Sequence, residues 1–163
     1  MTATETITRE LSLEERITRL EDIHEINNLK AKYVEACDND HDPVAFSELF
    51  AEDGSWEGPG HGKYTGRENI KKFIEEIRGD YLWCAHYLIR PWIEISESGT
   101  EATAEWYAHI YEVVKDENGN ELSELAFARY YDTLSKIDGK WYLQTVRAES
   151  SRLWEMGKDW IRA

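Results

Sequence analysis

The first third of the chain carries apolar residues at helical spacing. A capping box opens this region, with Ser12 as the N-cap and Glu15 three residues later. The same capping spacing recurs at Asp22 and Glu25, so we expect a bend or a fresh helix start just before them. The polar residues and proline at 39–43 predict the helix end. Apolar residues lie at helical spacing before the expected break and on one stripe after it: Leu13, Ile17, Leu20, then Ile23, Ile26, Leu29, Tyr33 and Ala36.

Shorter elements follow this helical region. Pro43 suits the first turn of a short helix. A strand-like piece around residues 55–57 then leads into a glycine-rich loop at 58–62. A further helix is expected over 69–78. Its inward-facing residues are Ile70, Phe73, Ile74 and Ile77.

From residue 83 onward the pattern changes to long strands rich in aromatic and β-branched residues. Four segments have this composition: 83–95, 101–115, 122–136 and 140–150. Each separator contains a turn signal, and the pairs Asn118-Gly119 and Asp138-Gly139 favour tight hairpins. Helices followed by an antiparallel meander predict an α+β fold with the N-terminal helices packed on a curved sheet. We expect a flexible segment at 1–11 and one domain over 12–163, with an apolar pocket between helices and sheet.

Composition narrows the classes of partner. Seven Trp and nine Tyr against four Phe favour a partly wet pocket wall or a subunit interface, because these rings carry a polar tip. The formal net charge of −14 disfavours nucleic acid and anionic membranes as partners. Two cysteines are too few for a disulfide framework or a thiolate zinc site, so no metal is expected. No secretory signal and no stretch of roughly 20 apolar residues is visible, which makes the cytoplasm the expected location.

The strand at 101–115 has two contrasting faces. Its even positions are mostly alanine, Trp106 and Ile110, whereas its odd positions include His109 flanked by Tyr107 and Tyr111. The odd face is therefore a candidate wall of a polar-lined cavity, with a solvated face as the alternative. Arg129 lies in the middle of the next strand, where a charge suits a carboxylate partner or a pocket.

His86 is the first candidate for chemistry. It lies in the most apolar strand start of the chain, where a neutral imidazole needs a partner for its N–H. Asp38, at the end of the tyrosine-bearing helix, is a candidate partner that would fix the tautomer and make the other nitrogen a general base. The alternative is a core histidine that donates to a backbone carbonyl. His24, His41 and His61 have no metal-like spacing and are expected at the surface.

Five segments, taken in order, resemble the SnoaL-like branch of the NTF2-like superfamily. The resemblance extends from about Leu13 to Ser150. The five segments are 26–38, 50–56, 64–70, 86–94 and 138–141. The resemblance implies a cone-shaped α+β fold around a pocket. Within the branch the chain is similar to scytalone dehydratase, bile-acid 7α-dehydratase and hexachlorocyclohexane dehydrochlorinase, which are lyases that need no cofactor and use a histidine assisted by an aspartate.

The resemblance also implies roles for particular residues. Asp38 and His86 match the aspartate and histidine positions, and Tyr33 precedes the aspartate as a tyrosine or lysine does in these enzymes. His109 matches a second histidine of scytalone dehydratase, where the bile-acid enzyme has an acidic residue instead, and Arg129 matches an arginine of the dehydrochlorinase on the following strand. The expected substrate contacts are Trp56, Arg129, Tyr107 and Tyr111.

The sequence therefore predicts a cofactor-independent, dehydratase-type lyase acting on a small, largely apolar molecule. The alternatives are an isomerase or polyketide-cyclase-type enzyme with the same residues, and a binding domain without chemistry, because fold alone does not decide among them. The expected assembly is a homotrimer, with a homodimer as the alternative.

Overall fold

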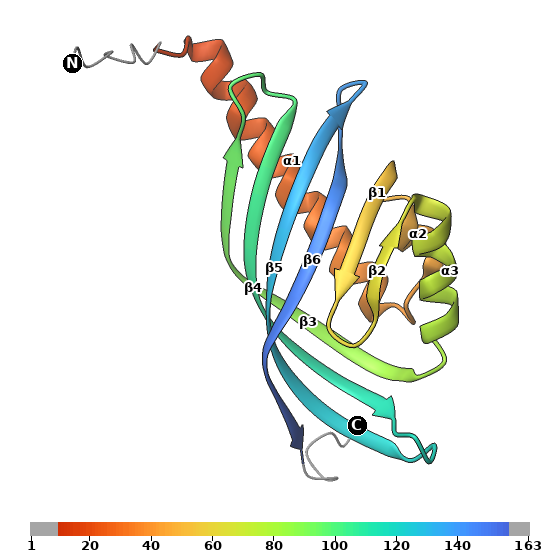
Figure 1. Ribbon diagram of the computed structural model, residues 1–163. Helices are drawn as coiled ribbons and strands as arrows, with labels where there is room; N and C mark the ends of the chain where they lie inside the picture. The colour runs from red at the N-terminus through yellow and green to blue at the C-terminus, as the bar shows by residue number, and fades with distance from the viewer. Residues whose placement is uncertain (1–9, 157–163) are drawn as a thin grey trace, which may run out of the picture.

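The computed structural model of the protein describes residues 10–156 (Figure 1). Residues 1–9 of the expected flexible segment lie outside this part, as do residues 157–163 at the end of the expected domain. Three helices come mostly early in the chain: α1 (Leu13–Asp38), α2 (Pro43–Ser47) and α3 (Arg67–Ile77). The six strands are β1 (Phe50–Gly58), β2 (Gly62–Thr65), β3 (Tyr81–Ile95), β4 (Glu101–Lys115), β5 (Glu121–Ile137) and β6 (Lys140–Met156).

The helix α1 begins at the predicted capping box. The Ser12 side chain accepts a hydrogen bond from the Glu15 N–H at 3.2 Å, and the Glu15 carboxylate accepts one from the Ser12 N–H at 2.8 Å. The helix then continues unbroken for 26 residues, so the predicted bend or fresh start before Asp22 is wrong. Asp22 is not a cap. Its carboxylate is buried and accepts hydrogen bonds from Lys136 Nζ at 2.6 Å and Trp141 Nε1 at 2.9 Å.

The strands form one curved, unclosed sheet in the order β2-β1-β6-β5-β4-β3 (Figure 1). All neighbouring strands are antiparallel except β1 and β6, which are parallel. The Asp138-Gly139 hairpin joins β5 to β6 with φ values of 50° and 79°, the positive values that a type I′ turn requires. Helices packed on a mostly antiparallel sheet confirm the predicted α+β class.

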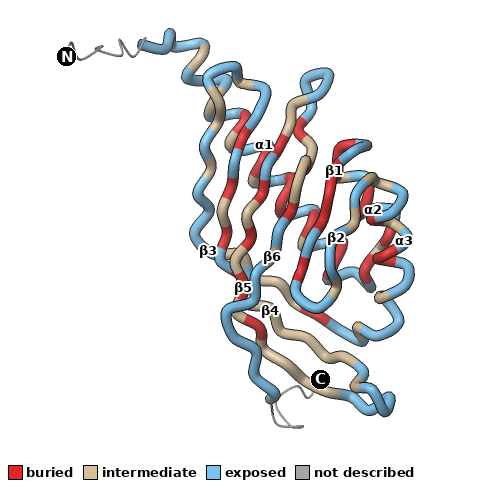
Figure 2. The backbone as a smooth tube through the Cα atoms, viewed as in Figure 1, coloured by how far each residue is buried: buried red, intermediate tan, exposed pale blue. Residues whose placement is uncertain are grey.

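The two faces of the sheet differ in burial. The even residues of β4 from Ala102 to Ala108 are buried against the helices, together with Ile26 and Tyr33 of α1 and Phe73 of α3. Figure 2 shows buried residues concentrated along α1, β1 and the adjoining parts of β4, β5 and β6, while the far ends of these strands are intermediate or exposed. The far ends of β4 and β5 curve beneath α3 together with the start of β3 (Figure 1). This curvature positions the site described below.

A charged pair lies inside the core. Lys30 Nζ is 2.9 Å from Asp132 Oδ2, and both side chains are 1% exposed. The same oxygen accepts a hydrogen bond from Trp106 Nε1 at 2.9 Å. Lys30 Nζ also lies over the ring faces of Tyr33 and Tyr130, 4.1 Å and 4.0 Å from their centroids, which is the geometry of a cation–π contact. Burial lowers the pKa of Lys30 and raises the pKa of Asp132.

Within residues 10–156, no helix combines the length and the apolar composition that crossing a membrane requires.

Candidate active site

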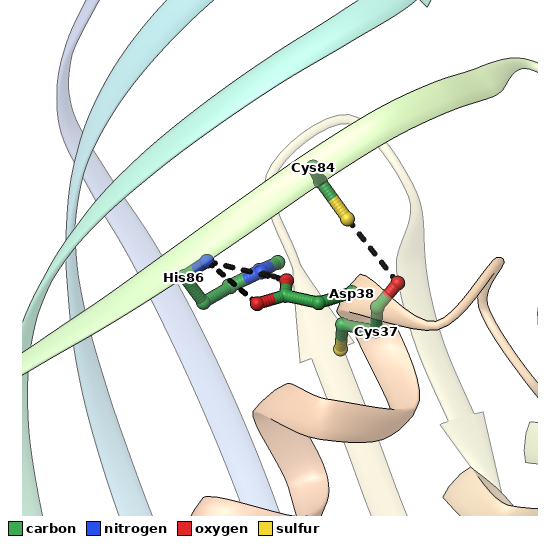
Figure 3. A network of polar contacts seen from close by, with 4 residues as sticks. All are labelled: Cys37, Asp38, Cys84 and His86. Atoms are coloured by element: carbon green, nitrogen blue, oxygen red, sulfur yellow. Dashed lines mark hydrogen bonds and ion pairs between the residues drawn. The ribbon is translucent and has the colours of Figure 1, made fainter.

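The side chain of His86 is directed by the strand ladder. His86 in β3 pairs with Ile110 in β4, and Cys84 pairs with Glu112, so these residues share the face that the helices cover. The helix α1 ends at Asp38, directly beside this part of β3 (Figure 3). Residues 48 positions apart in the sequence are therefore brought together by docking of the helix end on the sheet.

Asp38 and His86 form the hydrogen bond expected from the sequence. His86 Nδ1 lies 2.6 Å from Asp38 Oδ1, and the His86 backbone N–H lies 3.2 Å from Oδ1 and 3.1 Å from Oδ2 (Figure 3). Because an ionised carboxylate only accepts, Nδ1 carries the proton of this hydrogen bond, and in the neutral tautomer Nε2 has the free lone pair. Burial alone would raise the pKa of Asp38, but the hydrogen bonds from the His86 ring and backbone lower it below its ordinary value. The carboxylate is therefore ionised at neutral pH.

His86 lines a cavity of about 320 Å³ between the helices and the curved part of the sheet. Its walls are mostly aromatic and aliphatic, and among the described residues they include no lysine or arginine. Two of the predicted site residues, Tyr33 and Trp56, line the same cavity. Its size falls at the lower end of small-molecule sites.

Tyr33 and Trp56 are linked to each other. Trp56 Nε1 donates a hydrogen bond to the Tyr33 hydroxyl at 2.9 Å, and both residues are buried. Burial raises the pKa of Tyr33 well above its ordinary value, so the phenol stays protonated. Its oxygen already accepts one hydrogen bond, and the Tyr33 hydroxyl is also hydrogen-bonded to that of Tyr130.

Sequence reasoning missed an acidic pair in this cavity. Glu112 and Glu124 face each other across β4 and β5, and both line the cavity. Burial and the charge of Glu124 raise the pKa of Glu112 to about 7. Glu112 is at an even position of β4 and follows Ile110 by two residues. Strand alternation places Glu112 on the same face as Ile110, so Glu112 could have been predicted as a cavity residue if the sequence had shown that the helices cover this face.

The cavity also contains histidines that were expected at the surface. His41 is 7% exposed, its ring lies 4.5 Å from that of Tyr81, and burial lowers its pKa to about 4. His61 Nε2 lies 3.3 Å from the Tyr81 hydroxyl, and burial lowers the pKa of His61 as well. The expectation of surface positions for these two histidines is wrong. Both are neutral cavity residues at physiological pH.

The structure places four predicted site residues on the opposite face of the sheet. The His109 ring packs in a tilted arrangement against Phe127 at a centroid distance of 4.3 Å, and Arg129 pairs with Glu105. Arg129 also lies over the ring of Tyr107 at 5.1 Å, and Tyr111 packs against Tyr87 at 5.8 Å. The prediction that these odd-numbered residues share the cavity of His86 is therefore wrong. The even face of β4 turns inward because its small alanines allow the helices to approach closely.

The fold and the site define a class: an α+β protein with an apolar cavity that contains a carboxylate–imidazole pair. The sequence profile of the SnoaL-like domain matches residues 18–147, and the chain belongs to this family. No curated protein matches the chain in sequence.

Solved structures show the same fold. The chain is similar to a hexachlorocyclohexane dehydrochlorinase (LinA) of type 2, with a TM-score of 0.81, 17% identity and coverage of 91% of this chain and 97% of the other. It is also similar to a scytalone dehydratase-like protein of Novosphingobium aromaticivorans, with a TM-score of 0.75, 23% identity and coverage of 91% and 94%. An NTF2-like protein of the same organism gives a TM-score of 0.67 at 25% identity, covering 89% and 92%. The resemblance expected from the sequence is confirmed.

Proposed function

We propose that the protein is a cofactor-independent lyase that eliminates a leaving group from a small, largely apolar molecule. The observation that carries this proposal is the 2.6 Å contact between Asp38 and His86 at the wall of an apolar cavity. An ionised aspartate on Nδ1 makes Nε2 the basic nitrogen and stabilises the imidazolium that forms when it accepts a proton. Family membership and the dehydratase and dehydrochlorinase neighbours support the lyase class.

The proposed reaction balances within the cavity. His86 Nε2 removes a proton from a carbon, the electron pair of that C–H bond forms a double bond, and the leaving group departs from the neighbouring carbon with its own bonding pair. A leaving hydroxyl needs a proton to depart as water. Glu112 is the proposed donor, because its raised pKa keeps much of it protonated near neutral pH. Tyr33 is the proposed hydrogen-bond donor to a substrate oxygen, which would replace the Tyr130 hydroxyl as its partner. His109, Arg129, Tyr107 and Tyr111 have no part in this site, because they face away from the cavity.

Glu112→Gln is expected to lower turnover by about 10²- to 10⁴-fold for a substrate that loses water, because the amide cannot supply the proton. In the wild type, activity should fall as the pH rises through about 7, where Glu112 loses its proton. Glu124→Gln is the matched variant. It removes the neighbouring charge and should therefore move this fall to lower pH. A pH–rate profile measures both effects, and an unchanged profile in Glu124→Gln would exclude Glu112 as the group that titrates.

The direct test of the lyase proposal uses the substrates that the relatives' names supply. Purified protein is incubated with scytalone and with hexachlorocyclohexane, and loss of water or release of chloride is followed, with His86→Ala as the control. Turnover that disappears in the control supports elimination. An isomerase or cyclase using the same base would convert substrate without a leaving group, which mass spectrometry of the product detects. Binding without any conversion would favour a binding domain.

We also propose self-association through the outer face of the sheet, as a homotrimer. Tyr87, Trp92 and Trp154 are 59%, 58% and 49% exposed there, a large apolar surface for a chain with a net charge of −14. Sedimentation velocity at micromolar concentration should give a mass about three times that of one chain. The double variant Tyr87→Ser/Trp92→Ser should shift the mass toward the monomer. A monomeric wild type would contradict this proposal.

A further inference from the structure

Three potential metal ligands surround one point beside the dyad. Cys84 and His86 lie two residues apart in β3 and project from the same face, and Asp38 lies between them at the end of α1 (Figure 3). The Asp38 carboxylate, the Cys84 thiol and the His86 ring offer one ligand atom each, and these atoms all lie within 4.8 Å of one another. Among residues 10–156 this is the only such group of three.

The chemistry of these ligands selects a class of ion. One nitrogen, one oxygen and one sulfur suit zinc and similar borderline ions, whereas magnesium and calcium require oxygen ligands. Zinc bonds of about 2.0–2.3 Å in a tetrahedral site place ligand atoms roughly 3.3–3.8 Å apart. The three atoms can meet this spacing if the ion inserts between His86 Nδ1 and the carboxylate, now 2.6 Å apart, and water takes the fourth position.

The group is also accessible from one side. The Asp38 side chain is 31% exposed, the His86 side chain is 8% exposed, and Cys84 is buried. An ion can therefore reach the carboxylate from solvent and close onto the imidazole and the thiol behind it. In the absence of an ion, the Cys84 thiol donates to the Cys37 carbonyl at 3.2 Å, and burial, followed by the charge of Asp38, raises its pKa above the ordinary value.

We propose that Asp38, Cys84 and His86 form an inhibitory site for a zinc-class divalent cation. The thiol releases its proton to solvent and coordinates as thiolate. His86 binds the ion through Nδ1, so its ring proton must reside on Nε2, the atom that the lyase proposal uses as the base. The bound ion thus removes the free lone pair of the base and occupies its aspartate at the same time. Binding is independent of the proposed function, and only the inhibition rests on it.

Cobalt is the probe for binding, because a cobalt–thiolate bond gives a charge-transfer band in the near ultraviolet. Cobalt chloride is titrated into the full-length protein, and zinc is then added as a competitor. The wild type should develop the band and lose it with zinc, while magnesium should have no effect. Cys84→Ala should abolish the band. Cys37→Ala, which removes a buried cysteine outside the group of three, should retain it.

Three results would overturn the proposal. They are the absence of the band in the wild type, its persistence in Cys84→Ala, and its loss in Cys37→Ala but not in Cys84→Ala. If Cys84→Ala does not fold by circular dichroism, Asp38→Asn and His86→Ala supply the same test, since each should weaken the band. Inhibition is measured separately as loss of turnover with zinc, restored by a chelator. Absence of turnover with a normal cobalt band would contradict the lyase proposal and leave the metal site supported.

Discussion

His86→Ala is expected to reduce turnover by about 10²- to 10⁴-fold with little change in the fold, because it removes the proposed general base. The imidazole lies at the wall of a cavity and contributes no buried apolar packing comparable to that of Phe73 or Ile70. Steady-state kinetics with a substrate that the wild type converts measures the decrease in kcat, and thermal unfolding tests whether the fold is retained. A variant with wild-type kcat would exclude His86 as the base.

Asp38→Asn separates orientation from general acid–base chemistry. Asparagine keeps the size of the side chain, but its NH₂ group donates, so Nδ1 can be held in the wrong tautomer with the proton on Nε2. We expect a decrease in kcat that approaches that of His86→Ala, as in other enzymes whose carboxylate orients an imidazole. The double variant should be no worse than His86→Ala alone, because both residues act through one nitrogen. Additive losses would indicate that Asp38 acts independently.

Lys30→Met should have the largest effect on stability. It leaves Asp132, 1% exposed, as a buried carboxylate without its cation, and breaking a buried pair in this way typically costs about 3–5 kcal/mol. Urea unfolding at neutral pH measures the change in the free energy of unfolding. Lys30→Met/Asp132→Asn is the matched variant, because its amide oxygen can still accept from Trp106 Nε1 while no charge remains. The double variant should recover much of the loss.

The pH dependence of Lys30→Met follows from the same charge. Burial raises the pKa of Asp132 even beside Lys30, and removal of the ammonium raises it further. A folded-state pKa above the unfolded value of about 3.9 means that the folded chain holds its proton more tightly. The loss in the free energy of unfolding caused by Lys30→Met should therefore be largest at alkaline pH and should shrink as the pH falls through the raised pKa of Asp132. A deficit that is constant with pH would instead indicate lost packing of the lysine stem.

Local sequence signals predicted the elements well, because the forces that define them act over a few residues. The Ser12–Glu15 capping box and the Asp138-Gly139 turn were both found where expected. The same signals failed at Asp22, which has the same spacing to an acidic residue as Ser12 but lies inside a continuous helix. Lys136 and Trp141, more than 110 positions away, make Asp22 a buried acceptor in the middle of a helix.

The site was partly predictable for a related reason. Strand alternation shows that His109 and Tyr107 share a face and that Ile110 and Glu112 share the other, but it does not show which face the helices cover. The rings on the odd face are typical of a cavity wall. The face that the helices cover is instead the even one, where the small side chains of Ala104 and Ala108 allow close packing. The pairing of Asp38 with His86 was found because resemblance to a family supplied the long-range contact that local patterns lack.

Asp38 is the last residue of α1, so the proposed partner of the general base is part of the helix terminus. The last turn contains no basic residue, so the negative end of the helix dipole meets a carboxylate there, an arrangement that disfavours the helical state. The three hydrogen bonds from His86 offset this. Each time the imidazole accepts a proton, it becomes the cation that the helix end otherwise lacks. In the proposed reaction the helix end is thus held more tightly while His86 carries the extra proton, and fraying of this one turn would separate Asp38 from His86 well before the sheet unfolds.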